Sequence, residues 1–400
     1  MFGSLRVRNY RLFASGQVVS TIGTWMQRIA QDWLVLELTG NDPVALGVAA
    51  ALQFLPTLMF SLWAGILADR LDKRRLLILV QAGIAGSAAV LGLLNVTGLV
   101  TLWQVYVMCF VLGCFTAVET PVRQSFVAEM VGRAQMTNAI ALNSMTFNMS
   151  RIVGPAIAGF LITWIGTGWL FFVNAASTLG VITGLIMMNP DLLFRGPAVR
   201  RARGQLREGV RYAAGRPEIL TVLILMAFVS TFGVTFYTSL AIMAANVFHM
   251  RADGYGLLST MLAIGTLSGA LLAARRSTRT RPTPRLVLRA AFLFGVLEFV
   301  SGLMPTYIAF GLALVPLGVA AMTMMNSANT TVQLSASPEM RGRVMGLYMF
   351  IFFGGNPIGG PLSGWLAAEL GGRSPLLIGG AVAALAAVGC ALLYRRLSAR

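Results

Sequence analysis

The chain has 400 residues, of which 56% are hydrophobic and only 11% are charged. Soluble proteins carry roughly 25% charged residues, so this composition excludes an ordinary soluble protein and indicates an integral membrane protein. The formal net charge of +17 is large enough for nucleic-acid binding, but the arginines lie in short segments between long apolar runs. That distribution indicates a lipid bilayer as the partner and argues against nucleic acid.

Apolar runs of about 20 residues are long enough to cross a bilayer as helices. Twelve such runs follow one another along the chain, separated mostly by short turns rich in Gly, Pro, Asn or Thr. They lie near residues 12–38, 43–67, 75–97, 100–122, 138–163, 168–188, 219–247, 254–274, 285–303, 306–334, 342–368 and 374–394. The sequence therefore predicts an all-α membrane protein with twelve transmembrane helices.

The one long interruption is the arginine-rich segment 189–218, which leaves six runs on either side. We therefore expect an N-terminal six-helix bundle at 1–188, a cytoplasmic central loop at 189–218 and a C-terminal six-helix bundle at 219–400. Two similar stretches in the fifth run of each half indicate pseudo-symmetry between the bundles, since both place Gly-Pro ahead of another Gly. These stretches read SRIVGPAIAGFL at 150–161 and NPIGGPLSGWL at 356–366.

The positions of the basic residues predict the orientation of the chain. With the N-terminus inside, all but four of the 31 Lys and Arg residues lie in segments on the inner side. The four exceptions are Arg28, Arg151, Arg251 and Arg373. Because Lys and Arg concentrate in cytoplasmic loops, we expect a multi-pass protein of the plasma membrane with both termini in the cytoplasm.

A polar stripe follows the first apolar run, at spacings of three and four residues that place the side chains on one helical face. Its members are Gln17, Thr21, Thr24, Arg28 and Asp32, flanked by Gln27 and Gln31. An ionisable group inside a membrane helix costs about 2.5–3.5 kcal/mol, so the stripe should face the bundle interior or a water-filled cavity. One interpretation is a cavity with a titratable carboxylate at Asp32. The other is a fixed Arg28–Asp32 ion pair that holds two helices together.

The segment GILADRLDKRR at 65–75 is a tight, strongly charged turn between the second and third runs. It resembles the loop signature of the major facilitator superfamily, commonly written G-x-L-A-D-R-x-G-R-R/K. The matching residues include Gly65, Asp69, Arg70, Lys73 and Arg74, whereas Asp72 stands where a glycine is usual. The resemblance implies a gating loop in which the Asp69 carboxylate anchors the closed inner side.

Two further sets of polar residues lie in the fourth and fifth runs. Glu119 and Arg123 are one turn apart near the cytoplasmic end of the fourth run. We interpret them as an inner gate or a structural pair, with a role in coupling as the alternative. In the fifth run Ser144, Asn148 and Arg151 share a face, and Arg151 is expected to meet a carboxylate or the cavity.

The remaining ionisable groups give weaker signals. Glu298 lies near the outer end of the ninth run, where we expect its side chain to reach the membrane surface. The cysteines lie inside apolar runs and the single histidine, His249, cannot build a metal site alone, so no metal site is expected. The sequence contains no Walker A, HExxH or GxSxG motif, which argues against an enzyme.

The start of the chain carries a more specific resemblance. The stretches NYRLF at 9–13, Gly16-Gln17 and WLVL at 33–36 are similar to the twelve-spanner exporter branch of the superfamily. That branch includes macrolide-type drug efflux pumps and enterobactin exporters. Gly154, Pro155 and Gly159 match the antiporter helix motif of the superfamily. The resemblance implies the two-bundle major facilitator fold, alternating access and proton antiport in a monomer, with the proton gradient as energy source and no cofactor.

We therefore expect a secondary active transporter that exports amphiphilic small molecules in exchange for protons. The residues expected at the proton-coupling site and cavity are Asp32, Arg28, Gln31, Thr24, Glu119, Asn148 and Arg151. Among them Asp32 is the predicted coupling carboxylate. Many drug antiporters carry an arginine in the fourth run, but here Met108 and Cys109 precede Gly113. The alternatives are a siderophore or metabolite exporter of narrow specificity, and a receptor or scaffold that transports nothing.

Overall fold

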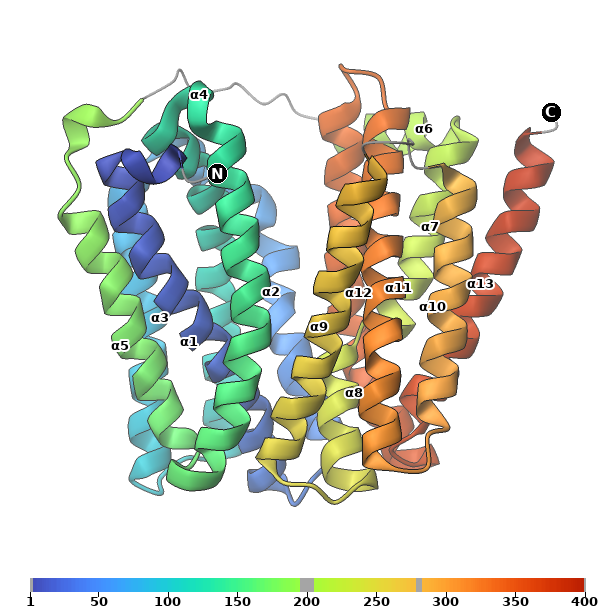
Figure 1. Cartoon of the computed structure of the whole chain (residues 1–400), viewed down its shortest axis with the longest axis horizontal. Coiled ribbons are helices and arrows are strands. Elements are labelled where there is room, and N and C mark those ends of the chain that lie inside the picture. The colour runs from blue at the N-terminus through green and yellow to red at the C-terminus, as the bar shows by residue number, and fades with distance from the viewer. Residues whose placement is uncertain (1–2, 195–204, 278–282, 399–400) are drawn as a thin grey trace. The chain divides into compact units, whose positions relative to one another are not determined.

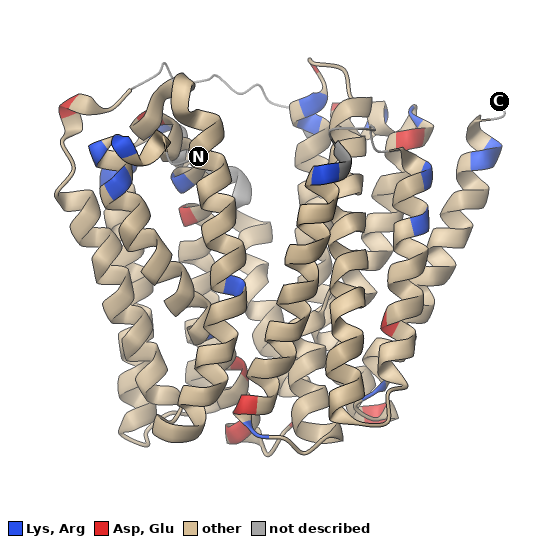
Figure 2. Ribbon diagram, viewed as in Figure 1, with Lys and Arg blue, Asp and Glu red and all other residues tan. Residues whose placement is uncertain are grey.

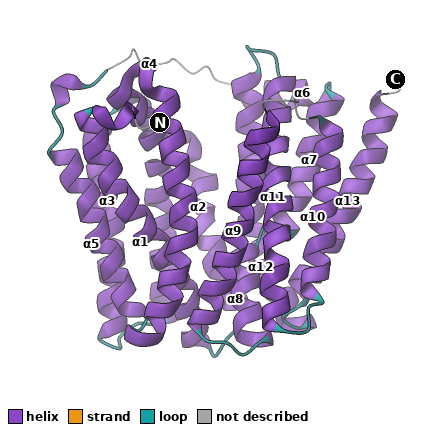
Figure 3. Ribbon diagram, in the orientation of Figure 1, coloured by secondary structure: helices purple, strands orange, loops and turns teal. Residues whose placement is uncertain are grey.

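The computed structural model describes residues 3–194, 205–277 and 283–398. It describes the side chains of these residues with the following exceptions: Ser61, Leu62, Gly65, Ile66, Ala68, Asp69, Arg133, Gln205, Leu206, Arg207, Arg276 and Ser277. Within these ranges the helices are joined by loops and turns, and no strand is present (Figures 1 and 3). The all-α prediction is therefore confirmed for this part of the chain.

The α-helices follow the predicted apolar runs closely. They are α1 (Arg8–Thr39), α2 (Pro43–Arg70), α3 (Lys73–Val96), α4 (Leu102–Ile165), α5 (Thr167–Ile186), α6 (Gln205–Ala214), α7 (Pro217–Phe232), α8 (Phe236–Ile242), α9 (Ala252–Ser277), α10 (Pro284–Gly302), α11 (Tyr307–Ser335), α12 (Arg341–Leu370) and α13 (Ser374–Ser398). Three short elements complete the set: the 3-10 helices η1 (Gly3–Arg6) and η2 (Pro190–Leu192), and the π-helix η3 (Met243–Val247).

Nine helical segments of the described residues are long and apolar enough to cross a membrane. The nine do not include α1, α10 and α12. In α1 the reason lies in its polar stripe, because Gln17, Arg28 and Asp32 make the helix less apolar. The chain is thus a multi-pass membrane protein, and the total of twelve spans remains a prediction.

The helix α4 covers two of the predicted runs. Its backbone is interrupted at Gly132, where φ is 65° and ψ is −178°. A positive φ is readily adopted only by glycine, so this residue lets the chain turn between the stretches Leu102–Gly132 and Ala134–Ile165. The segment between residues 122 and 138, expected as a loop, is therefore helical except at this turn.

The predicted run 219–247 is broken near its middle. The helix α7 ends at Phe232, Gly233 follows as its C-cap, and α8 begins only at Phe236. The predicted central loop 189–218 also contains ordered structure, because α6 lies within it. The break depends on local backbone hydrogen bonding, and α6 depends on packing against other helices. The pattern of apolar residues indicates neither.

Helix starts follow local capping chemistry. Asp72 is the N-cap of α3, and its side chain accepts a hydrogen bond from the Arg75 amide at 2.9 Å. Thr101 and Gln104 form a capping box at the start of α4. Thr306 accepts a hydrogen bond from the Ala309 amide at 3.2 Å at the start of α11. Asp72, which departs from the family signature, thus satisfies an otherwise free backbone donor.

The chain divides into two compact units. Unit 1 contains residues 1–40, 52–200 and 251–260, and unit 2 contains residues 41–51, 201–250 and 261–400. In unit 1 the apolar core lies among α1, α3, α4 and α5, with Phe13, Phe126 and Met130 at its centre. Most described Lys and Arg residues lie at one helix end of each unit (Figure 2). In unit 1 this is the end that carries the N-terminus, and in unit 2 the end that carries the C-terminus (Figure 2).

Candidate functional site

Asp32 lies in the second half of α1 and is 7% exposed. Tyr255, in the first turn of α9, donates a hydrogen bond of 2.7 Å from Oη to Asp32 Oδ2. Trp33 stacks on the Tyr255 ring, with centroids 6.4 Å apart and ring planes 23° apart. Residues 251–260 belong to unit 1, as α1 does, so the whole contact lies inside one unit. Arg28, one turn before Asp32, is near enough to act electrostatically on its carboxyl.

Arg28 also belongs to a cluster of two arginines and three aromatic rings. The Arg28 guanidinium lies 5.1 Å from the centroid of the Phe54 ring and 5.9 Å from that of Trp25. Arg151 of α4 lies 5.8 Å from the same Trp25 centroid, and Phe147 packs edge-on against Trp25 at 5.8 Å. Aromatic faces attract cations. We call these five residues the Trp25 cluster, to which α1, α2 and α4 all contribute.

The two buried glutamines that flank the stripe join α1 to its neighbours. Gln27 is 4% exposed and accepts a hydrogen bond from the Asn174 amide group of α5. Gln31 is 2% exposed and donates to the Cys109 sulfur of α4 at 3.0 Å. Buried amides need such partners, so these two residues fix the position of α1 within unit 1.

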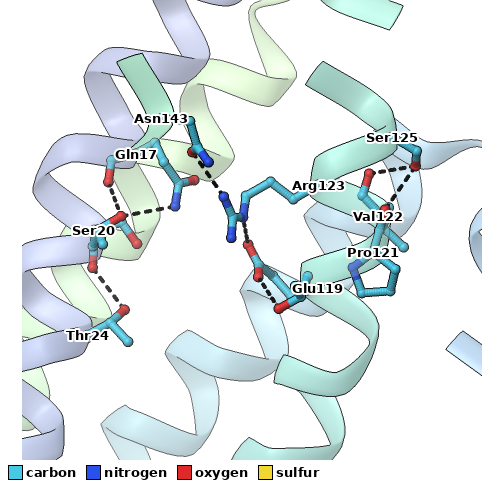
Figure 4. Close-up of polar contacts among 11 residues, drawn as sticks. Gln17, Ser20, Thr24, Glu119, Pro121, Val122, Arg123, Ser125 and Asn143 are labelled. Atoms are coloured by element: carbon cyan, nitrogen blue, oxygen red, sulfur yellow. Dashed lines mark hydrogen bonds and ion pairs between the residues drawn. The ribbon is translucent and has the colours of Figure 1, made fainter. Parts of the chain in front are cut away.

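Thr24 and Asn148 were expected at the same site, and both bond to their own helices. Thr24 Oγ1 donates to the Ser20 carbonyl at 2.9 Å (Figure 4). Asn148 Nδ2 donates to the Ser144 carbonyl at 2.8 Å, and its side chain is exposed. Local bonding of this kind is the usual behaviour of small polar residues in membrane helices.

Glu119 and Arg123 form an ion pair within the first stretch of α4. Arg123 Nε donates to Glu119 Oε1 at 2.7 Å, and Arg123 Nη1 donates to Asn143 Oδ1 at 3.0 Å (Figure 4). Asn143 lies in the second stretch of α4, beyond the turn at Gly132. The three side chains therefore join the two stretches of α4, and the structural interpretation of this pair is favoured.

The glycines of the antiporter helix motif are positions of close helix contact. A Cβ added at Gly154 would lie 2.5 Å from Trp25 Cβ of α1. A Cβ added at Gly159 would lie 2.7 Å from the Ala252 carbonyl oxygen of α9. Pro155 lies between them within the helix. Small residues let helix backbones approach, so this face of α4 holds together the two elements that carry Asp32 and Tyr255.

The charged turn at 65–75 is joined to the rest of unit 1 by its two last motif cations. Lys73 Nζ lies 2.5 Å from Glu129 Oε1 of α4. Arg74 donates from Nε to the Leu185 carbonyl at 2.6 Å and from Nη2 to the Ile186 carbonyl at 2.7 Å. The second contact caps the C-terminal end of α5, where a cation also meets the favourable end of the helix dipole.

The other motif residues have no contact described here that joins the turn to unit 1. Arg70 is the last residue of α2 and is exposed. Gly65 and Asp69 lie in α2, but their side chains fall outside the described residues. The anchoring role expected for Asp69 therefore remains a prediction.

Unit 2 has a comparable arrangement around α6. Arg343 Nη1 of α12 lies 2.6 Å from Glu208 Oε2 of α6. The Ser337 amide donates to Tyr212 Oη at 3.0 Å. This hydrogen bonding with Ser337 lowers the pKa of the Tyr212 hydroxyl. The helix that the sequence did not predict is thus fixed to α12 and to the segment that precedes it.

Sequence reasoning missed Tyr255, Glu129 and Asn143, which supply the partners of Asp32, Lys73 and Arg123. All three lie within or beside apolar runs and carry no periodic signal of their own. The Asp32–Tyr255 contact joins residues 223 positions apart. An unexplained acid on a membrane helix was the only available sign that such a partner exists.

The expectation for Glu298 is wrong. Its side chain is 2% exposed, so it does not reach the surface of unit 2. The residue lies one turn before the end of α10, where its helix packs against α13 and α11. Proximity to a helix end therefore did not predict exposure of the side chain, because neighbouring helices cover the Glu298 carboxyl.

Chemically, unit 1 offers a buried acid with a hydroxyl donor, next to cations held against aromatic rings. A carboxyl of this kind can take up or release a proton when its neighbours separate. The arginines can bind an anionic group, and the rings can bind apolar surface. These are the elements from which a small-molecule site with a titratable group can be built.

Comparison with known proteins shows which family the chain resembles. A family model described as transmembrane secretion effector matches residues 1–399. The macrolide efflux protein A of Streptococcus pyogenes is 23% identical over 402 residues, which cover 98% of this chain and 97% of that protein. The enterobactin exporter EntS of Shigella flexneri is 24% identical over 307 residues, which cover 76% of this chain and 72% of that protein.

The fold has relatives among solved structures. A bacterial homolog of the human lysosomal transporter Spinster, solved in an inward-facing and unoccupied conformation, superposes with a TM-score of 0.71 at 14% identity. The match covers 98% of this chain and 96% of that protein. The chain therefore shares the fold of this transporter.

The family match and these relatives identify the protein as a membrane transporter and not an enzyme. The chain belongs to the transmembrane secretion effector family of the major facilitator superfamily. The predicted resemblance to macrolide-efflux and enterobactin-exporter proteins is confirmed.

Proposed function

We propose that the protein is a proton-coupled exporter of amphiphilic small molecules that works by alternating access. It would act as a monomer in the plasma membrane, with twelve transmembrane helices in two six-helix bundles and both termini in the cytoplasm. Family membership supports transport, and the relatives named for efflux and export support the outward direction. The grouping of basic residues at one helix end of each unit supports the orientation (Figure 2).

The observation that carries the proposal is the buried contact between Asp32 and Tyr255. A carboxylate in a membrane helix is costly unless it has a role, and hydrogen bonds to a charged group contribute about 1.5–3 kcal/mol. Asp32 combines burial with a single defined hydroxyl donor on another helix. It is therefore the best-supported coupling group among the carboxyls of unit 1.

The proposed cycle uses protonation of Asp32 to loosen this contact. An ionised Asp32 accepts a strong, charge-assisted hydrogen bond from Tyr255. Protonation removes the charge, weakens the bond and lets the first turn of α9 separate from α1. Loss of the proton after the chain has changed conformation restores the bond. In this way the carboxyl would be charged in one conformation and neutral in the other.

Transport by everted membrane vesicles tests the proposal. Vesicles that contain the protein should accumulate at least one compound from a panel of fluorescent amphiphiles when a proton gradient is imposed, and should release it when an ionophore removes the gradient. Vesicles prepared without the protein provide the control. The panel includes macrolides and siderophores. If no compound accumulates to a different level in the two preparations, the transport proposal is wrong and a receptor or scaffold role is favoured.

A siderophore or metabolite exporter of narrow specificity is the second candidate. It is favoured by the Trp25 cluster, in which Arg28 and Arg151 lie over one indole ring. Such a site suits a ligand with both an anionic and an aromatic group, and one relative is named an enterobactin exporter. Competition experiments in the same vesicles distinguish the two candidates. A narrow exporter should be inhibited by one anionic compound and by none of the neutral amphiphiles.

A further inference from the structure

A second buried carboxyl lies in unit 2, away from any residue used above. Glu298 is 2% exposed, and its Oε2 atom is buried without a hydrogen-bond partner in the part of the chain that the structure describes. The nearby Ser301 hydroxyl donates to the Glu298 backbone carbonyl at 2.7 Å and not to its carboxyl. An ionised carboxyl in such a place is very costly, whereas a neutral one costs much less.

The Glu298 carboxyl lies beside the break between α7 and α8. A Cβ added at Gly233 would be 3.1 Å from Glu298 Oε2. A Cβ added at Gly379 of α13 would be 3.3 Å from Glu298 Oε1. Gly233 is the residue directly after α7. Two glycines thus leave room for the carboxyl at the point where the helix stops.

The backbone at this break offers acceptors and few donors. The amide of Val234 bonds to the Val229 carbonyl at 2.9 Å, as the amide of Gly233 does. The regular series of helical bonds therefore ends at this point. The last carbonyls of a helix carry a partial negative charge and lack helical donors. The Phe232 carbonyl is in close contact with the Cβ position of Gly379, next to the carboxyl. A protonated Glu298 can donate to such a carbonyl, whereas an ionised one is repelled.

No charged side chain of the described neighbouring helices is placed to balance an ionised Glu298. On α7 the acid Glu218 is in the first turn, about 22 Å along the helix from Gly233. On α13 the basic residues Arg395 and Arg396 are in the last turn, about 24 Å from Gly379. The helix α11 has no charged residue in its sequence.

The remaining basic groups near α10 are also accounted for. Arg285 and Arg289 of α10 itself lie about 20 and 14 Å away along the helix. Arg373 donates to the carbonyls of Gly302 and Met304, at 3.0 and 2.8 Å. The rings of Phe294 and Phe236 pack edge-on near the break, with centroids 5.8 Å apart, and exclude water.

We propose that Glu298 is a proton-binding site of unit 2, whose neutral carboxylic acid stabilises the break between α7 and α8. Ionisation of the acid would expel it from this packing and open the break. The site is separate from Asp32 and does not depend on which carboxylate couples transport. It gives the second unit a proton-controlled hinge of its own.

Infrared difference spectroscopy of the purified protein in lipid nanodiscs tests the protonation state. At neutral pH the wild type should show a carbonyl-stretching band of a buried protonated carboxyl that the Glu298→Gln variant lacks. The Asp32→Asn variant should keep this band. The test of Glu298 therefore does not depend on whether Asp32 is the coupling carboxylate. Glu369→Gln, which removes an exposed carboxyl at the end of α12, is the matched control and should also keep it. An identical spectrum for wild type and Glu298→Gln would overturn the proposal.

Hydrogen exchange tests the hinge. Amides of residues 230–240 in the wild type should exchange faster, beyond the intrinsic chemical effect, as the pH is raised. In Glu298→Gln, which cannot ionise, exchange of the same amides should stay slow throughout the pH range. Equal pH dependence in both proteins would contradict the proposal. So would a Glu298→Gln variant that fails to fold, because a neutral amide should replace a neutral acid with little disturbance.

Discussion

At the scale of single residues, the contact between Asp32 and Tyr255 joins α1 to the first turn of α9. The two side chains meet through one hydrogen bond of 2.7 Å, supported by the stacking of Trp33 on the tyrosine ring. Because the hydroxyl supplies the bond and the ring supplies the packing, the two contributions can be separated by mutation.

Tyr255→Phe should keep the ring against Trp33 but remove the donor to Asp32. We expect gradient-driven transport to slow by about tenfold, which corresponds to about 1.4 kcal/mol, the low end for a lost bond to a charged group. Initial rates in everted vesicles measure this, normalised to the amount of inserted protein. Tyr394→Phe, in the last turn of α13, is the matched control and should leave the rate unchanged. An unaltered rate in Tyr255→Phe would show that the hydroxyl is not used.

At the scale of helices, ion pairs and close contacts hold the elements of unit 1 together. The pair Lys73–Glu129 joins the start of α3 to α4, and Gly154 lets α4 lie directly on α1. The first is electrostatic and partly exposed, while the second is steric and buried. They should therefore respond to different substitutions.

Glu129→Gln should lower the melting temperature of the purified protein by about 2–4 °C, as expected for a loss of about 1 kcal/mol in a unit of this size. The side chains of Lys73 and Glu129 are 19% and 15% exposed, which leaves the pair only partly screened. Arg75→Gln changes an exposed charge in the same turn and serves as the control. Equal melting temperatures for both variants would mean that the Lys73–Glu129 pair contributes nothing measurable.

Gly154→Ala should destabilise the contact between α4 and α1 by about 1–3 kcal/mol, because the added methyl group would overlap Trp25. Gly86→Ala is the control, since a Cβ there meets nothing within 4 Å. That change should be neutral or slightly stabilising in a helix. Thermal unfolding followed by tryptophan fluorescence compares the two variants. A Gly154→Ala protein as stable as Gly86→Ala would refute the close contact.

At the scale of the whole molecule, helix positions were predictable and long-range partners were not. Apolar runs located α1, α3 and α5 to within a few residues, because length and composition decide which segments can cross a bilayer. A break between residues 122 and 138 was predicted, but the helical structure on both sides of Gly132 was missed because it continues beyond the apolar runs. Asp32, Arg28 and Arg151 were predicted because charged residues on apolar helices stand out, whereas Tyr255 on another helix does not.

The membrane orientation is testable at two described loops. In a variant without the native cysteines, Asn41→Cys between α1 and α2 should react with an impermeant thiol reagent added outside intact cells. Glu339→Cys between α11 and α12 should react only after the membrane is opened. Asn41 and Glu339 are both exposed, so reactivity reports sidedness. Labelling of Glu339→Cys but not Asn41→Cys from outside would reverse the predicted orientation.

The most direct test of proton-coupled export is transport by Asp32→Asn in reconstituted vesicles. The variant keeps the shape of the side chain and removes its titration. We expect gradient-driven accumulation to fall by at least about tenfold, while substrate-for-substrate exchange stays within about twofold of the wild type. Glu119→Gln, which breaks the ion pair in α4, should reduce both activities together. Full gradient-driven accumulation by Asp32→Asn would contradict the account, and the Asp32–Tyr255 contact would then be structural.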